Sequence, residues 1–416
     1  MKSFLSYLAE AAKNTHMTHI EDSVIYGGVD GTRQAINALR ELRDMLAGHT
    51  GSKTDVTIKW DGAPAVFCGI VPPENEKAGE FFVGKKSVFN KTPKYYTTPA
   101  EVDADTSGDL ADKLKMALKH LRGVVTEGVF QGDFMFTEND VSTDTIDGVR
   151  YYTFQPNTIV YAVPVDSEAG REIKSAKIGV VFHTRYTGNS FQTMSSSFNV
   201  NALRDFKNSS SVWIQDAGLR DLSGTATLTE KDTEEVTAAL STAGKIFQRI
   251  SGSTLREIEN NPEFAQMIEQ FNNTYVREGE VIRNTSAHVT NMIRWIEGKY
   301  EKAASQRKTQ RGKEAQYAKR DEILAFFSDQ NKKNLKLVFD LQKALVDAKL
   351  IIINKLDKLN DMDTFVRTRN GYKTTGQEGY VAIDHLSGNA VKIVDRMEFS
   401  YNNFSADILK GFDKIR

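Results

Sequence analysis

The chain has little cysteine and no long apolar run. Cys68 is the only cysteine among 416 residues, which excludes an intrachain disulfide and is typical of a reducing compartment. No apolar run approaches the roughly 18 residues that a membrane-spanning helix needs, and residues 350–353 are far too few. The first residues lack the apolar core of a signal peptide. We therefore expect a cytoplasmic protein without membrane contact.

Net charge is also nearly absent. The sequence has 54 Lys and Arg residues against 55 Asp and Glu residues, a formal charge of -1. Such a balance gives the whole molecule no attraction to nucleic acid or to a membrane, so a polyanion site would have to be a local patch.

One local patch lies between residues 299 and 320. It contains eight basic residues and only two acidic ones, Glu301 and Glu314. The patch has two interpretations of equal weight. It could follow a phosphate backbone, with Trp295, Tyr300 and Tyr317 available for stacking. It could equally be the solvated face of a helix.

Histidine gives no clear metal centre. His16 and His19 are three residues apart, near Glu21 and Asp22, but a third ligand is not evident, so packing or capping is the favoured role. His183 follows an apolar run. It could either face a pocket or have a purely structural role.

The order of hydrophobic patterns predicts two domains, one interrupting the other. A chain of this length is too long for one ordinary core. Strand patterns dominate 51–195 and return in 366–416, whereas 196–365 shows long helical spacing. A helical segment, 1–50, precedes them, with helices expected at 1–14 and 31–46. We expect an α/β (α+β) fold with antiparallel sheets, interrupted by a large all-helical insert.

Lys59-Trp60-Asp61-Gly62 is the most informative short motif. It follows the β-branched run 56–58 and precedes the apolar run 65–67, which predicts a strand, a tight turn and a second strand. A lysine facing a pocket there can become a nucleophile, because desolvation and neighbouring cations favour its neutral form.

Four further segments follow in an order that suits nucleotide chemistry. They supply two lysines after a strand, a carboxylate between a glycine and an apolar strand, an aromatic residue on a central strand, and a late carboxylate followed by a late lysine. These residues are, in chain order, Lys85 and Lys86, Asp133, Tyr161, Glu378 and Lys392.

This ordered set resembles the covalent nucleotidyltransferase superfamily of ATP-dependent RNA and DNA ligases and capping enzymes. The nearest likeness within it is to the RNA ligases of T-even phages, through Gly84-Lys85-Lys86-Ser87. Residues 57–163 also look like a family of uncharacterised proteins from large tailed phages. The resemblance covers roughly 54–190 and 370–400, and the segment between them has no counterpart.

The resemblance implies a set of roles. Lys59 would attack the α-phosphorus of ATP and form a lysyl-AMP. Asp61 and Gly62 would shape the turn of a nucleotide-binding site. That site would also include the other residues of the set: Lys85 or Lys86 on a phosphate or the ribose, Asp133, Tyr161 near adenine, and Lys392 on the α-phosphate. Asp133 and Glu378 would hold Mg²⁺. Tyr161 is also readily explained as a core residue.

The sequence departs from the pattern at several positions. Pro64 and Ala65 replace an Arg or Asn that often follows the Asp-Gly, Asp133 replaces a Glu, and Lys392 is not followed by a second lysine. No recognisable OB-fold follows Lys392. These departures affect ligation more than nucleotide binding.

A second resemblance concerns residues 1–11, which are similar to the capsid-targeting peptides of T-even-type phage head proteins. A cleavage pattern of that family matches Leu8-Ala9-Glu10. This implies packaging inside a phage capsid, and a plain docking helix is an equal alternative.

Three functions follow as hypotheses. The first is an ATP- and Mg²⁺-dependent RNA ligase-like enzyme of the infected host cell, which transfers AMP to a nucleic acid with a 5′-phosphate end, RNA in preference to DNA. The second is nucleotidyl transfer to a protein or a small molecule. The third is a non-catalytic internal head or assembly protein that keeps the fold.

Overall fold

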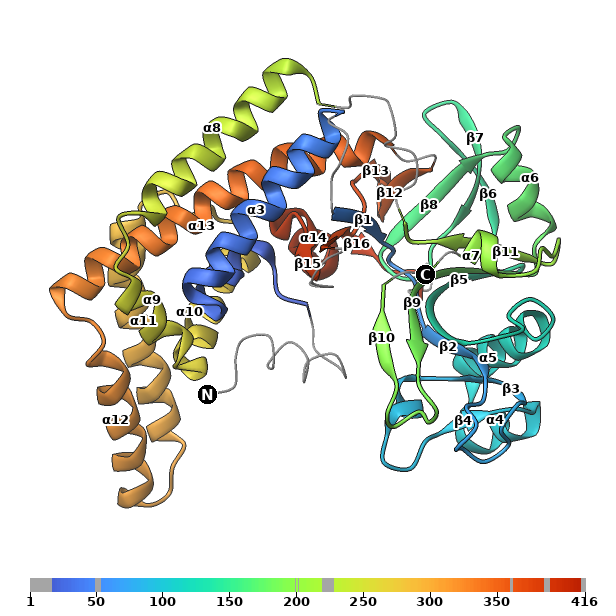
Figure 1. Cartoon of the computed structure of the whole chain (residues 1–416), viewed down its shortest axis with the longest axis horizontal. Helices are drawn as coiled ribbons and strands as arrows, with labels where there is room; N and C mark the ends of the chain where they lie inside the picture. Colours follow the sequence, from blue (N-terminus) through green and yellow to red (C-terminus); the bar gives the residue numbers. More distant parts are fainter. Residues whose placement is uncertain are drawn as a thin grey trace.

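The chain folds into a helical lobe and a β lobe, which lie side by side (Figure 1). The computed structural model describes residues 17–48, 54–198, 200, 202–218, 228–359, 362–384 and 390–412. The predicted helix at 1–14 and the capsid-targeting pattern at 1–11 lie outside these residues, as does His16. The fold is of the α+β class, with several antiparallel sheets.

The largest sheet of the β lobe has seven strands. Its order is β10 (Ser195–Ser197), β9 (Ile178–Thr187), β5 (Val129–Thr137), β2 (Ala65–Ile70), β3 (Phe81–Gly84) and β4 (Tyr95–Tyr96). β11 (Val212–Asp216) pairs in parallel with β9, while the other pairs are antiparallel. Helices α4 (Pro99–Asp105) and α5 (Gly108–Leu121) belong to the same lobe. The apolar stripe of α5, including Leu114 and Leu118, packs with Cys68 and Phe130 of the sheet.

A second sheet closes the core of the β lobe. It has the order β13 (Gly371–Thr374), β12 (Asp363–Thr368), β8 (Ile159–Pro164), β7 (Val149–Phe154) and β6 (Ser142–Ile146), with β16 (Ile408–Leu409) beside β12. Phe154 and Tyr161 of this sheet pack against Phe136 and Trp213 of the first. Helices α6 (Glu168–Ser175), α7 (Ala202–Asp205) and α14 (Arg396–Phe404) complete the lobe.

A third, three-stranded sheet joins distant parts of the sequence. β1 (Thr54–Lys59) pairs with β14 (Gly379–Asp384), which pairs with β15 (Ala390–Ile393), all antiparallel. Val56, Tyr380 and Ile393 of this sheet are buried in the core of the helical lobe. The sheet therefore fixes the Lys59 turn to the last strands of the chain.

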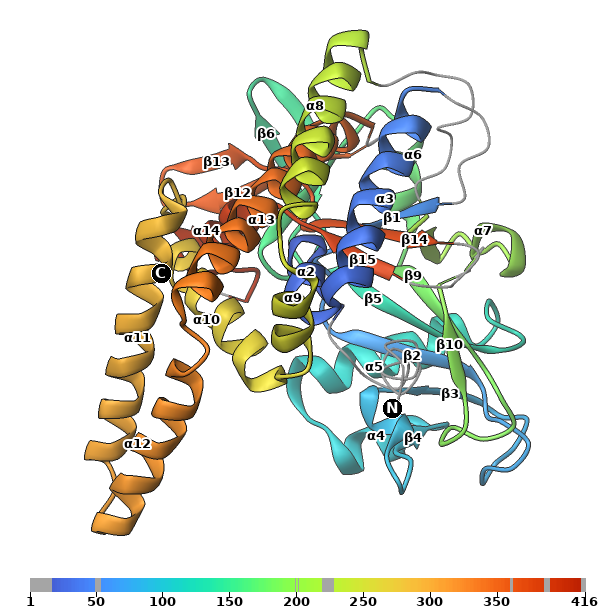
Figure 2. The same ribbon diagram turned by 60° about the vertical axis from the view of Figure 1, so that its left-hand side comes forward.

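The helical lobe is built around α13 (Asp329–Leu356), the longest helix that the structure describes. Around it lie α2 (Ser23–Tyr26), α3 (Gly28–Leu46), α8 (Glu230–Phe247), α9 (Gly252–Glu259), α10 (Pro262–Glu278), α11 (Thr285–Ser305) and α12 (Gln310–Leu324) (Figures 1 and 2). Leu39, Leu240, Ile268 and Leu345 meet in its core. Short 3₁₀ turns, η1 (Ile20–Asp22), η2 (Lys86–Phe89) and η3 (Asp357–Leu359), complete the order.

Most expected elements are present, with shifted boundaries. The helix expected at 31–46 is α3, and the pattern at 338–359 is the C-terminal part of α13 together with η3. The helical insert was expected at 196–365, but its first long helix begins at Glu230, because β10 and β11 still belong to the β lobe. The helical part of 1–50 packs within the helical lobe and is no separate segment.

Buried ion pairs join the two lobes. Glu21 of η1 binds Lys349 of α13, with both of its oxygens 2.8 Å from Lys349 Nζ. Asp22 accepts a 2.8 Å hydrogen bond from Arg396, the first residue of α14. Although burial opposes it, Lys349 and Arg396 lower the pKa of Glu21 to about 2. These four residues, called the junction cluster below, connect the N-terminal segment, α13 and α14.

Candidate functional site

Lys59 lies at the end of β1, where three strands bring charged side chains together. In register it pairs with Gly379, the residue after Glu378. Lys59 Nζ forms an ion pair with Glu378 Oε1. The side chain of Lys59 is 32% exposed and that of Glu378 only 11%, so the amine is reachable from solvent and its partner is nearly enclosed.

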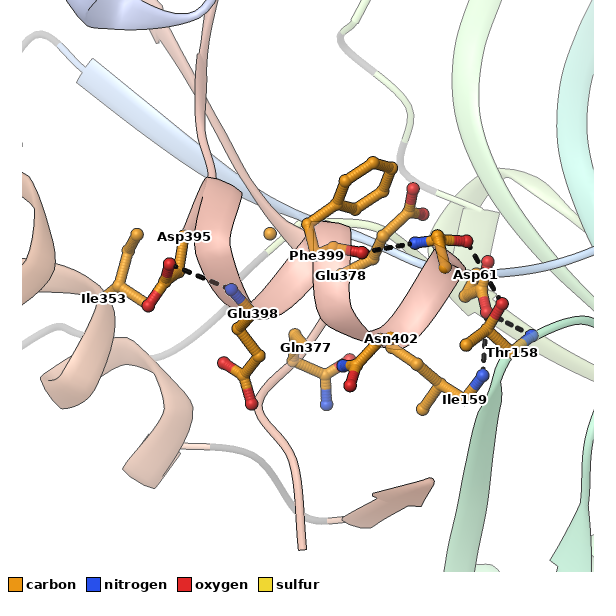
Figure 3. A pocket seen from close by; sticks show the side chains of 12 residues that line it. Asp61, Thr158, Ile159, Ile353, Gln377, Glu378, Asp395, Glu398, Phe399 and Asn402 are labelled. Atoms are coloured by element: carbon orange, nitrogen blue, oxygen red, sulfur yellow. Dashed lines mark hydrogen bonds between the residues drawn. The ribbon is translucent and has the colours of Figure 1, made fainter. Parts of the chain in front are cut away.

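The turn after Lys59 is held by the buried carboxylate of Asp61. Asp61 Oδ2 accepts hydrogen bonds from the backbone N–H groups of Thr158 and Ile159, at 2.6 and 2.8 Å (Figure 3). Asn157 Nδ2 donates to Asp61 Oδ1 at 2.8 Å. The Asp61 N–H donates to the Tyr161 hydroxyl at 2.7 Å. Asp61 thus anchors the turn to the start of β8, and this network fixes the position of Lys59.

Gly62 allows the turn to approach β5 closely. A Cβ atom at Gly62 would lie 2.5 Å from Asp133 Cβ and 2.9 Å from Met135 Sδ, closer than side chains tolerate. The strand that follows, β2, pairs Ala65 with Asp133. The glycine therefore brings the Asp133 carboxyl group and Lys59 into one site.

Asp133 of β5 and His183 of β9 border the site on the side of the seven-stranded sheet. His183 Nε2 lies 3.8 Å from Asp133 Oδ2. Burial is the main cause that raises the pKa of Asp133 to about 7, against the opposing attraction of Lys59. Burial and Lys59 lower the pKa of His183 to about 4. His183 is thus a neutral imidazole at neutral pH, and Asp133 lies near its titration midpoint.

Glu378, just before β14, and Lys392 of β15 complete the site. Burial raises the pKa of Glu378 to about 7, although Lys59 opposes the shift. Burial and then the charge of Lys59 lower the pKa of Lys392, which places the two lysines within electrostatic reach of each other. Gly379, at φ 153°, leaves no room for a Cβ, which would lie 2.4 Å from Val394 Cγ2.

A small hollow lies behind the Lys59 turn. Asp61, Glu378, Thr158 and Ile159 line one part of it, and Phe399 and Asn402 of α14 line another (Figure 3). Because Asp61 and Glu378 also border this hollow, α14 lies next to the Lys59 turn.

The expected contact between Tyr161 and adenine is not possible in this arrangement. Tyr161 is 0% exposed and stacks on Trp60 and on Phe154, with ring centroids 5.0 and 5.5 Å apart. Its hydroxyl serves the Asp61 turn. Tyr161 is a core residue beneath the site, as its second interpretation held, because both neighbouring strands bury this position.

Lys85 and Lys86 lie at the same end of the large sheet, two strands from Asp133. Gly84, the last residue of β3, pairs with Phe67 of β2, and Ala65 of the same strand pairs with Asp133. Lys86 is exposed and Lys85 half-buried. Among the described residues, no contact joins either lysine to Lys59, and their phosphate role stays a prediction.

The carboxylates of Asp133 and Glu378 could bind a metal ion that enters the site together with a nucleotide. No group of three or more His, Cys, Asp or Glu side chains in the described ranges could hold a metal by itself. Mg²⁺ is commonly bound by one or two carboxylates together with substrate phosphates. Asp133 and Glu378, two partly buried oxygen donors with raised pKa values beside Lys59, fit that donor set.

Sequence reasoning missed the residues that hold the site in place. Asn157 and Thr158 lie about a hundred positions from Asp61, and only the Asn-Thr pair before an apolar strand indicated a turn there. His19, for which packing or capping was the favoured role, lies beside Lys392, and its pKa falls to about 3, chiefly through burial. Cys68 is buried and its thiol pKa is raised, as expected of an inert core residue.

Comparison with known proteins gives a family but no activity. A family model described as "Family of unknown function (DUF6267)" matches residues 14–408. No curated protein matches the chain, and no solved structure does either. None of the helices in the described part of the chain is long and apolar enough to cross a membrane. With nearly its whole length matched, the chain belongs to this family of unknown function, DUF6267.

Proposed function

We propose that this protein is an ATP-dependent nucleotidyltransferase that forms a lysyl-AMP at Lys59 and passes the AMP to the 5′-phosphate end of RNA. One observation carries the proposal. Lys59, Asp133, Glu378 and Lys392, four residues chosen by motif order, converge on one site although they span more than 300 positions.

The first step joins the Lys59 nitrogen to the α-phosphorus of ATP. The P–N bond forms as the bond to the bridging oxygen breaks, and pyrophosphate leaves with that electron pair. Lys59 must be neutral to attack.

Asp133 and Glu378 would hold the metal that accompanies the nucleotide. Mg²⁺ bound there would offset the charge of the phosphates and compete with Lys59 for Glu378. Lys392 supplies a fixed cation for the charge that develops on the α-phosphate. Asp61 and Tyr161 contribute by holding the turn rather than by touching the nucleotide.

The acceptor follows from the resemblance to T-even phage RNA ligases. The second step would exchange the P–N bond for a bond to the 5′-phosphate oxygen of RNA, which returns the free amine. Transfer to a protein or a small molecule would use the same first step.

Intact-mass measurement after incubation with ATP and Mg²⁺ tests the first step. We expect the wild-type protein to gain the mass of one adenylyl group, Lys59→Ala to gain none, and the exposed-site control Lys91→Ala to behave as wild type. Loss of the adenylyl group from the protein on addition of 5′-phosphorylated RNA, but not of 5′-hydroxyl RNA, would support RNA as the acceptor. A wild-type protein that stays unmodified with ATP, GTP and NAD⁺ would contradict the proposal.

A further inference from the structure

The basic patch of the sequence lies on a hairpin of two helices. α11 ends at Ser305 and α12 begins at Gln310, so the short turn between them is the tip. Between residues 302 and 313 there are five basic residues and no acidic one. This segment, called the hairpin tip below, contains Lys302, Arg307, Lys308, Arg311 and Lys313.

The hairpin tip projects from the helical lobe. Figures 1 and 2 show α11 and α12 extending together beyond the other helices. Ile323, near the end of α12, is the only buried residue of that helix among those described. Lys302, Arg307, Lys308 and Arg311 are all exposed. The tip therefore presents its cations to solvent from several directions.

Within the part of the chain that the structure describes, the charges of the hairpin tip are not neutralised by acidic side chains. Among the described residues, no carboxylate forms an ion pair with any of its five cations, whereas Arg320 at the base of the hairpin pairs with Asp321. The molecule as a whole carries a formal charge of only -1. A local excess of positive charge on a projecting element favours a polyanionic partner.

The aromatic residues near the tip serve the hairpin itself. Tyr300 is buried and donates to Glu263 at 3.3 Å, and Trp295 packs on Phe271. Tyr317 donates to Glu301 at 3.3 Å, and the guanidinium of Arg320 lies over its ring. With these rings engaged, the tip offers cations for phosphates but no platform for bases, so the stacking role considered for these aromatics is not supported.

We propose that the hairpin tip binds the sugar–phosphate backbone of RNA without reading its bases. This deepens the proposed function, because it rests on that function for the role of the RNA as acceptor. The binding itself depends only on the charges and exposure of the tip.

Binding of a fluorescent, 5′-phosphorylated single-stranded RNA, followed by anisotropy at several salt concentrations, tests the inference. The variant replaces Lys302, Arg307, Lys308 and Arg311 with Gln. A matched control replaces four exposed lysines elsewhere in the helical lobe with Gln, namely Lys231, Lys333, Lys343 and Lys358. Circular dichroism confirms that each variant is folded.

The tip variant should bind at least about tenfold more weakly, and the slope of log affinity against log salt should flatten by roughly 0.7 per lost contact. The control should keep its slope and bind within about twofold of wild type. Equal losses in the two variants would overturn the inference, as would undetectable binding by wild type. A preference of more than about tenfold between RNAs of equal length but different sequence would also overturn it.

Self-adenylylation, measured on the same variants, separates this inference from the proposed function. The tip variant should still form the lysyl-AMP, while Lys59→Ala should bind RNA as wild type does. If the tip binds RNA but no protein is adenylylated, the proposed function fails and the tip inference holds. If adenylylation occurs and the tip variant binds RNA normally, the reverse is true.

Discussion

At the scale of single residues, the carboxyl groups of Asp133 and Glu378 have shifted pKa values because the site is partly enclosed. Asp133 and Glu378 both have pKa values raised to about 7, with burial as the leading cause in each. Only Lys59 opposes that shift at Asp133. A cation bound beside these carboxyl groups would relieve the same cost.

Asp133→Asn should make the stability of the protein less dependent on pH. A carboxyl whose pKa is near 3.8 unfolded and about 7 folded binds more protons in the folded state, so its contribution to stability falls as pH rises between these values. Asn cannot ionise. We expect the variant to match wild type near pH 4 and to exceed it by on the order of 4 kcal/mol above pH 7.5.

Urea unfolding across this pH range measures the effect, with the exposed substitution Glu297→Gln as the baseline. A stability difference that shrinks with rising pH would contradict the assigned burial of Asp133.

Gly62→Ala should disable the site with a modest loss of stability. The new Cβ would lie 2.5 Å from Asp133 Cβ, so the turn must move away from β5. We expect a destabilisation of about 1–3 kcal/mol. Self-adenylylation should fall by roughly 100-fold, because small displacements of a reacting group are costly.

Gly244→Ala is the control for Gly62→Ala. A Cβ at Gly244, in the middle of α8, meets nothing within 4 Å, so this change should be neutral or stabilising by up to about 1 kcal/mol. Self-adenylylation of Gly62→Ala at the wild-type level would show that activity does not need the close approach of the turn to Asp133.

The sequence allowed the charged residues of the site to be predicted but not their supports. Lys59, Asp133, Glu378 and Lys392 each stand next to a glycine or on a short apolar strand, and their order forms a recognisable pattern. The partners of Asp61 could not be foreseen, since a backbone N–H leaves no mark in a sequence. Tyr161 was ambiguous because an aromatic residue suits both a core and a ligand site.

At the scale of elements, α13 holds the N-terminal segment in the helical lobe. Its thirteen buried residues include Lys349, whose side chain is 1% exposed and whose partner Glu21 is 4% exposed. Removing one partner of a buried ion pair leaves the other charge without compensation. α13 therefore holds the N-terminal segment through charge as well as through apolar contact.

Lys349→Met should destabilise the protein by about 3–5 kcal/mol, because Glu21 would lose its nearest cation. Lys343→Met, on the exposed side of the same helix, should change stability by less than about 0.5 kcal/mol. Urea unfolding of both variants at pH 7 gives the comparison. Similar stabilities for the two would show that Arg396 alone satisfies Glu21.

Long, periodic elements were predictable, whereas short ones in irregular surroundings were not. α3 and α13 repeat apolar residues over many turns, and both were expected. β11 has five residues, of which two are Gln215 and Asp216, and its parallel pairing with β9 spans a sequence gap. The boundary of the helical insert was therefore placed too early.

At the scale of the whole molecule, the chain passes between the lobes repeatedly. β1 begins in the core of the helical lobe, the segment from α8 to α13 returns to it, and β14 and β15 bring the end of the chain back beside β1. The junction cluster adds buried ion pairs at the same boundary. The two lobes should thus unfold together.

The three tryptophans allow this to be measured, because Trp60 and Trp213 belong to the β lobe and Trp295 to the helical lobe. Tryptophan fluorescence of Trp295→Phe follows the β lobe, and that of Trp60→Phe/Trp213→Phe follows the helical lobe. In each variant the urea transition seen by fluorescence should coincide with the transition seen by circular dichroism, which follows both lobes. A fluorescence transition that differs from the circular-dichroism transition of the same variant would show that the lobes unfold independently.

The position of Thr18 and His19 beside β15 has a consequence for solubility. β15 is the outer strand of the three-stranded sheet, and the Lys392 N–H donates to Thr18 O at 3.1 Å while His19 forms a bridge to the same residue. An uncovered strand edge is a template for pairing with another chain. Trimming that stops after Glu10 would leave this cover in place, whereas a cut beyond His19 would free the edge and promote aggregation.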